Sequence, residues 1–172
     1  MYRSPYEAYP FLSEPAEDLR CDFEILTDRI ASEAGWLSGM LEGELKEEVL
    51  AVAELIYHLN PSLRTFFSVT EAELTSLKDG TARHEAACQD RLKQFVTPQG
   101  TPAAGLAHVI RTDCKALVRL LYRYGERHDV DPRVIDMANL LSGYFFALAL
   151  RLNALAGVSE RPFVSRNYKR RD

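Results

Sequence analysis

The chain has 172 residues, of which 47% are hydrophobic and 27% charged, and this is typical of a single soluble globular domain with its own core. A formal net charge of -4 and a pI near 5.6 argue against a general nucleic-acid binder, although a local basic patch could still bind an anion. Three widely spaced cysteines form neither a disulfide framework nor a zinc-binding spacing, which favours the reducing cytoplasm.

The first 16 residues contain three tyrosines and three prolines. Proline lacks a backbone donor and restricts its neighbour, so we expect an irregular arm that packs on another surface. The arm could replace a ligand-binding loop, cover a site or join subunits.

Apolar residues at intervals of three and four predict a helix over residues 16–42 and a second over 44–59. Asn60-Pro61 follows, and Pro61 either kinks the second helix or opens a short one that runs through Phe67.

Thr70 and Glu73 have the spacing of a capping box, which predicts a third helix from there to Phe95, with an interruption at Asp79-Gly80.

Two further helices begin with a capping residue followed by proline. Thr101 precedes a helix over residues 102–128, and Asp131 precedes one over 132–156. With no alternating strand pattern in the chain, we predict an all-α fold, an antiparallel five-helix bundle.

We therefore divide the chain into an arm (1–16), a helical bundle domain (17–157) and a basic C-terminal tail (158–172). The start lacks a signal-peptide pattern, and the apolar stretch around residues 143–150 is too short to span a bilayer, so we expect no membrane partner.

A series of basic residues recurs every four positions along the fourth predicted helix: Arg111, Lys115, Arg119, Arg123 and Arg127. A four-residue step drifts by only about 40° around a helix, so the five cations share a slowly winding face. Like charges at this spacing repel one another. The face is therefore either solvated or a site for phosphates.

Two segments resemble ATP:cob(I)alamin adenosyltransferases of the propanediol-utilisation type. Residues 95–119, FVTPQGTPAAGLAHVIRTDCKALVR, are similar to the family pattern F-x-x-P-G-G-[ST]-x-A-A-x-L-H-x-A-R-T-x-C-R-R-A-E-R. Residues 131–153, DPRVIDMANLLSGYFFALALRLN, are similar to N-P-x-V-x-x-Y-L-N-R-L-S-D-x-L-F-x-L-A-R-x-x-N. The first half of the chain is less similar, although Asp28 falls near the family's Asp-Glu-Leu-Asn motif.

The chain also departs from the family pattern. It has no glycine in its first 34 residues, where the family has a glycine-rich phosphate loop. Lys115 and Ala116 replace two successive arginines, Val118 replaces a glutamate, and Gly143 replaces an aspartate.

The resemblance implies that the 5′-deoxyadenosyl group of ATP moves to the cobalt of cob(I)alamin, with release of triphosphate. It implies cobalamin, ATP and Mg²⁺ as the small molecules involved, and a homotrimer with sites between adjacent subunits. Gly35 and Gly39 would permit a close helix contact in such an assembly.

The same resemblance implies that Arg111, Lys115 and Arg119 together bind the phosphates of ATP, and we call these three residues the phosphate clamp. Arg111 and Arg119 would be catalytic, acting on the reacting triphosphate. Asn139 matches a polar position of the ATP site; the structural alternative is that it bonds to a neighbouring helix. Arg123 and Arg127 lie beyond the motif and are expected to face solvent or to pair with acidic neighbours.

Tyr57 falls near a family aromatic that flanks the lower face of the corrin, so it is our corrinoid-binding candidate; the alternative, which we favour, is a core tyrosine. His58 beside it could ligate cobalt, but a lone histidine is more often exposed or satisfied. His108 and Cys114 fit structural positions in the fourth helix.

Three functions are compatible with these residues. The first is an adenosyltransferase whose activity is intact or reduced by the lost motif residues. The second is a non-catalytic relative that binds a corrinoid or a nucleotide as carrier or sensor. The third is an oligomeric interaction module on the same fold.

Overall fold

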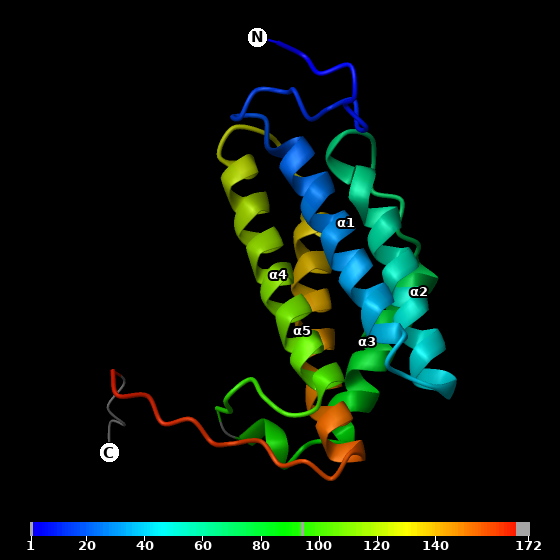
Figure 1. Ribbon diagram of the computed structural model, residues 1–172, viewed down its shortest axis with the longest axis vertical. Helices are drawn as coiled ribbons and strands as arrows, with labels where there is room; N and C mark the ends of the chain where they lie inside the picture. Colours follow the sequence, from blue (N-terminus) through cyan, green and yellow to red (C-terminus); the bar gives the residue numbers. More distant parts are fainter. Residues whose placement is uncertain (1, 94, 168–172) are drawn as a thin grey trace.

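The computed structural model describes residues 2–93 and 95–167 and folds them into an all-α helical bundle (Figure 1). The α-helices are α1 (Leu19–Ser38), α2 (Gly43–Leu59), α3 (Glu71–Ala86), α4 (Pro102–Gly125) and α5 (Pro132–Leu155), with short 3₁₀-helices η1 (Asn60–Leu63) and η2 (Arg91–Lys93). Within residues 2–93 and 95–167 the only β-type pairing is a bridge between Val96 and Pro162. The predicted five-helix bundle is confirmed.

The helix starts follow the capping residues that the sequence predicted. Thr70 and Glu73 form a complete capping box on α3. The side chains of Thr101 and Asp131 accept backbone hydrogen bonds at the starts of α4 and α5, and a proline follows each.

The predicted end of the third helix and its interruption are wrong. Helix α3 ends at Ala86, and turns connect it to η2. Gly80 does not break the helix. It is a point of close packing, since a Cβ there would lie 3.1 Å from Glu48 Oε1 and 3.4 Å from the Tyr144 ring.

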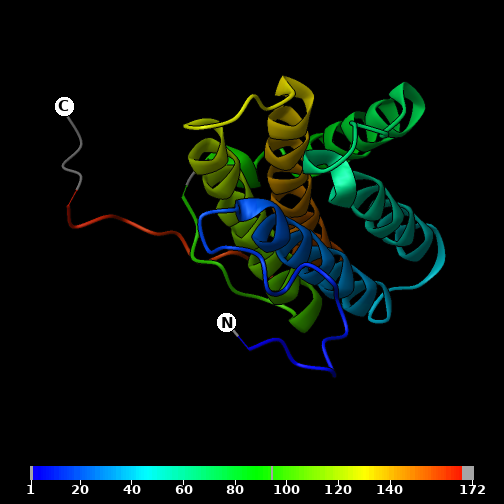
Figure 2. The ribbon, with the colours of Figure 1, turned by 90° about the horizontal axis from the view of Figure 1, so that it is seen from above.

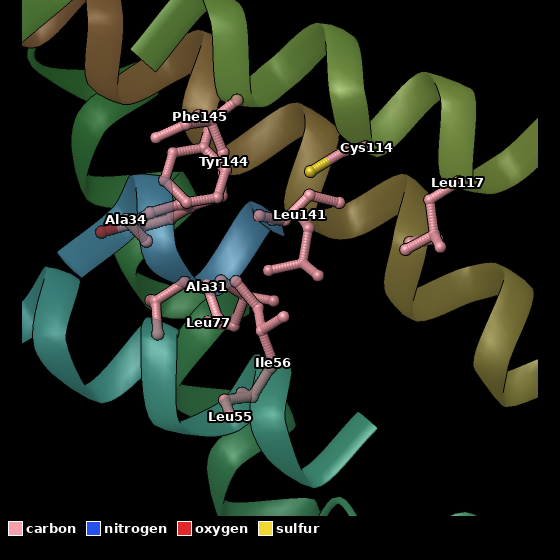
Figure 3. Close-up of a cluster of buried hydrophobic side chains, with 14 of the residues drawn as sticks. Ala31, Ala34, Leu55, Ile56, Leu77, Cys114, Leu117, Leu141, Tyr144 and Phe145 are labelled. Atoms are coloured by element: carbon pink, nitrogen blue, oxygen red, sulfur yellow. The ribbon is translucent and has the colours of Figure 1, made fainter. Parts of the chain in front are cut away.

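A single hydrophobic core lies between all five helices (Figure 3). Its labelled members are Ala31 and Ala34 of α1, Leu55 and Ile56 of α2, Leu77 of α3, Cys114 and Leu117 of α4, and Leu141, Tyr144 and Phe145 of α5. Helix α5 is long and apolar enough to cross a membrane by composition alone. Its burial among the other helices accounts for that composition, as expected of the central helix of a bundle.

The N-terminal arm lies across one end of the bundle, near η1, and the C-terminal segment leaves from the opposite end (Figures 1 and 2). Arg64 holds the arm. Its guanidinium group donates to Glu14 (2.6 and 2.8 Å) and Glu24 (2.5 Å), and lies 3.7 Å from the centre of the Phe11 ring. The arm therefore packs on its own subunit.

Candidate functional site

The first two cations of the basic series line a pocket of about 450 Å³ on the outer side of α4 and α5. Its wall is completed by Leu92, Lys93, Phe95, Val96, Ser142, Gly143 and Phe146. Arg111 and Lys115 thus face an apolar and aromatic cavity, which we call the main pocket.

Arg111 is half-buried with an unpaired charge. Its Nε has no hydrogen-bond partner in the described residues, and its guanidinium carbon lies 5.6 Å from the centre of the Phe146 ring. Burial lowers the pKa of Arg111, but an arginine stays protonated in proteins. An anion in the main pocket would satisfy this charge.

The other four cations of the series are exposed. Within residues 2–93 and 95–167, none of the five forms an ion pair. Arg123 and Arg127 face solvent, as one of the two expectations had it, and they do not pair with Glu126 or Asp129.

Asn139 lies on the open face of α5, and its structural alternative is wrong. The side chain is exposed, and its Nδ2 donates to the Ile135 carbonyl of its own helix (2.9 Å) rather than to a neighbouring helix. Ser142 Oγ lies 3.4 Å from the Arg111 carbonyl, which sets the register of the antiparallel helices α4 and α5. One turn earlier on α5, Asn139 therefore lies level with the α4 turn that carries Lys115.

Two aromatic residues of the main pocket were missed by sequence reasoning. Phe95 precedes the loop and is 85% exposed, and Phe146 is a half-buried residue of α5. Both lie inside the quoted motifs, but an aromatic at helical spacing usually reads as core. Gly143 of α5 also lines the main pocket, and no neighbouring atom lies within 4 Å of where its Cβ would be.

A buried clasp positions the loop that carries the pocket wall. Asn153 Nδ2 donates to the Gln99 carbonyl (3.0 Å) and to Glu160 (3.1 Å), and its Oδ1 accepts from the Thr101 amide (3.1 Å). Arg91 donates to the same carboxylate (2.6 Å). Segments distant in the sequence are therefore fixed around the residues that line the main pocket.

The C-terminal segment pairs with the pocket wall through its backbone. The Thr97 amide donates to the Arg161 carbonyl and the Phe163 amide to the Phe95 carbonyl, both at 2.8 Å. The start of the predicted tail is thus attached beside the main pocket; residues 168–172 lie outside the described part of the chain.

A second pocket of about 310 Å³ lies next to the first and shares Arg111 with it. It is lined by Pro98, Gly105, His108, Val109, Thr112 and Asp113 in addition to Arg111. We call it the side pocket.

The carboxylates beside the side pocket form a cluster between α1 and α4. Arg29 Nη2 lies 2.9 Å from Asp113 Oδ2 and Arg29 Nε donates to Glu33 (3.0 Å). Burial, with the nearby charge of Asp113, raises the pKa of Glu33.

Tyr57 lies on α2 and lines neither of these pockets. It is 54% exposed, so the favoured interpretation as a core residue is wrong. Its hydroxyl donates to Asp28 (2.5 Å), and this hydrogen bond raises the Tyr57 pKa. His58 is exposed as well, 3.7 Å from Glu73. Within one subunit, α1 lies between α2, which carries Tyr57, and α4, which carries the basic series (Figure 1).

Comparisons with known proteins point to one family. A family model described as cobalamin adenosyltransferase matches residues 17–152. The chain is 30% identical over 139 residues to a cobalamin adenosyltransferase of Cupriavidus metallidurans, covering 77% of this chain and 74% of that protein. It is 25% identical over 154 residues to a corrinoid adenosyltransferase of Bacillus subtilis, covering 84% of this chain and 79% of that protein.

Solved structures show the same fold. One variant of the PduO-type ATP:corrinoid adenosyltransferase from Lactobacillus reuteri, complexed with cobalamin and ATP, superposes with a TM-score of 0.76 at 21% identity, covering 86% of this chain and 87% of that one. A second variant, also complexed with cobalamin and ATP, gives a TM-score of 0.74 at 22% identity, covering 88% and 86%.

Proposed function

This chain belongs to the cobalamin adenosyltransferase family, and we propose that it transfers the 5′-deoxyadenosyl group of ATP to the cobalt of a reduced corrinoid, releasing triphosphate. One observation carries the proposal: the half-buried charge of Arg111, which is unpaired in the described residues, faces the same pocket as two aromatic side chains. That combination suits a reaction between a polyphosphate and a large, flat, mostly apolar ring.

The first three cations of the basic series would bind the triphosphate of ATP. Arg111, Lys115 and Arg119 follow one another at helical spacing and lack ion pairs in residues 2–93 and 95–167. Arg111 and Arg119 can each offer a planar pair of donors to phosphate oxygens, whereas Lys115 offers a point charge. Asn139, level with Lys115, would add a neutral donor. The cobalt is the nucleophile, so these residues position and stabilise charge and no catalytic base is needed.

Magnesium fits this arrangement as an ion carried with the nucleotide. The described part of the chain contains no group of three or more His, Cys, Asp or Glu side chains able to hold a metal. Mg²⁺ commonly keeps several waters and binds through substrate phosphates, so the triphosphate would hold it. The ion would neutralise charge on the leaving group.

The main pocket would take the corrin ring. Phe95 and Phe146 offer it two aromatic surfaces, and apolar surroundings favour the four-coordinate cobalt that is easier to reduce. Tyr57, our corrinoid-binding candidate, would have to come from a neighbouring subunit, because it is separated from this pocket within its own chain.

A homotrimer with sites between subunits would bring these parts together. Ile25 and Trp36 of α1 and Val109 of α4 are 49%, 63% and 46% exposed. The Arg29–Asp113 contact sets α1 beside α4, so these residues belong to one side of the bundle. An apolar face of this kind is typical of a subunit contact.

Three buried free cysteines, Cys21, Cys88 and Cys114, fit a cytoplasmic location.

The test is a single reaction. The protein is mixed with ATP, Mg²⁺ and chemically reduced cob(I)alamin, and the visible spectrum is followed for adenosylcobalamin. Turnover by the wild type that is weaker in Arg111→Ala supports the proposal. Arg123→Ala, on the same helix, is the matched control and should keep the wild-type turnover. A shift of the corrinoid spectrum without turnover would indicate a carrier or sensor instead. The absence of both would exclude a corrinoid function.

A further inference from the structure

His108 is a buried histidine of α4, and its two ring nitrogens lack partners in the part of the chain that the structure describes. The residue is 4% exposed, and neither Nδ1 nor Nε2 has a hydrogen-bond partner in the described structure. Most buried side-chain polar atoms in native proteins are hydrogen-bonded. Burying an imidazole without hydrogen bonds costs free energy. We therefore expect His108 to have a partner from outside its own subunit.

The side pocket gives His108 a place to meet such a partner. The ring lines this pocket of about 310 Å³, together with Arg111, whose Nε is also unpartnered, and Asp113. Pro98 and Val109 form apolar walls. The His108 ring centre lies 6.2 Å from that of Phe146, which lines the main pocket, so the two pockets are neighbours.

The chemistry of the side pocket selects a neutral polar group. Burial, and then the charge of Arg111, lowers the pKa of His108 to about 4, so at neutral pH the ring carries one N–H donor and one bare nitrogen acceptor. The Asp113 carboxylate disfavours a phosphate or a carboxylate in the same space. A primary carboxamide, with a carbonyl acceptor and an NH₂ donor, complements His108, Arg111 Nε and Asp113 together.

We propose that the side pocket binds a peripheral carboxamide side chain of the corrinoid, with His108 as its hydrogen-bond partner. The edge of the corrin ring of cobalamin carries acetamide and propionamide groups, and a ring held in the main pocket presents its edge to the pocket that shares Arg111 with it. The inference rests on the proposed function and adds a recognition site for the corrinoid. His108 positions and discriminates the substrate and takes no part in bond making.

The experiment compares cobalamin with its monocarboxylic acids, in which one propionamide is hydrolysed to a carboxylate. Wild-type protein and the His108→Phe variant are assayed for adenosylation of each reduced corrinoid. Phenylalanine keeps a ring beside Phe146 and removes both nitrogens. The matched control is His128→Phe, since His128 follows the end of α4, exposed and stacked on Tyr124.

We expect His108→Phe to raise the KM for cob(I)alamin about thirtyfold, the effect of losing two ordinary hydrogen bonds, and to leave the KM for ATP unchanged. One of the monocarboxylic acids should be a poor substrate for the wild type. In the variant the difference from cobalamin should be smaller, with the part that remains due to repulsion by Asp113. His108→Gln, which keeps one donor and one acceptor, should restore most of the affinity. The melting temperature of His108→Phe should stay level or rise, because no hydrogen bond within the subunit is lost.

Two results would overturn the inference. One is an unchanged cob(I)alamin KM in His108→Phe. The other is a fall in melting temperature accompanied by equal changes in both KM values, which would indicate a packing role. If the wild type neither binds nor adenosylates cob(I)alamin, the proposed function itself is wrong. If the wild type does both and His108→Phe has the same kinetic constants, only the carboxamide site is wrong.

Discussion

Gly100→Ala, which adds one methyl group, should destabilise the loop that forms part of the main pocket's wall. The φ of Gly100 is +137°, and a Cβ built there would overlap the side chain of Asn153. Asn153 is fully buried and holds the Gln99 carbonyl and the Thr101 amide. In Gly100→Ala, this side chain must move and release the loop.

Two effects add in this variant. A non-glycine residue at this φ costs on the order of 1–3 kcal/mol, and each neutral hydrogen bond lost from Asn153 costs about 1 kcal/mol. We therefore expect Gly100→Ala to lower the free energy of unfolding by about 3 kcal/mol or more. For a chain of this size, that is a fall in melting temperature of about 6–12 °C.

Thermal unfolding followed by circular dichroism tests this, and two other glycines provide controls. Gly157 also has a positive φ (+68°) but has no atom within 4 Å of its Cβ position, so Gly157→Ala should cost only about 1 kcal/mol. Gly143 is helical and equally open, so Gly143→Ala should be neutral or stabilising by up to about 1 kcal/mol. If Gly100→Ala melts no lower than Gly157→Ala, the clasp does not hold the loop as argued.

Three further predictions concern charge. Arg111→Ala should weaken ATP binding at least about tenfold in calorimetry with little loss of stability, since no ion pair is broken in the described residues; an unchanged affinity would remove Arg111 from the clamp. Lys115→Arg should raise kcat several-fold by restoring a two-donor contact, with a nearly constant KM for ATP; a fall in kcat would contradict this. Burial raises the pKa of Glu48, but hydrogen bonds from His84, Arg83 and Tyr144 and the charge of His84 outweigh it and lower this pKa to about 2. The stability from Glu48, on the order of 2 kcal/mol, is therefore present above its unfolded pKa near 4.5 and is lost as the pH falls toward 2. Glu48→Gln should flatten that part of the stability-versus-pH curve measured by urea unfolding, and an unchanged curve would refute the assignment.

The sequence predicted the parts of the fold that local chemistry decides. Thr70, Thr101 and Asp131 were recognisable because a cap depends on residues within one turn. The end of α3 was not, because the residues from Ala87 onward keep a helix-compatible composition, and tertiary contacts such as those of Arg91 with the C-terminal segment determine their path.

The same distinction applies to the site. Arg111 and Lys115 could be predicted together because helical spacing fixes their shared face. The pocket that Phe95 and Phe146 complete could not, because it depends on how the loop folds against α5. Tyr57 was misjudged for a similar reason: its place in an apolar segment suggests burial, whereas its hydroxyl faces Asp28 and solvent.

The departures from the family pattern can now be weighed by where they lie. Lys115 and Ala116 are exposed, Gly143 is open, and only Val118 packs against the core. Relative to the pattern, alanine removes one positive charge, while valine and glycine each remove one negative charge, so this face is no less attractive to phosphates than the family's. What this face lacks is directional hydrogen bonding, because two guanidinium forks and two carboxylate acceptors of the family pattern are absent. Long-range attraction depends on net charge, whereas the alignment of the 5′ carbon with cobalt depends on fixed hydrogen bonds. The substitutions should therefore affect kcat more than ATP affinity, which is why restoring a single fork at Lys115 is expected to act on turnover.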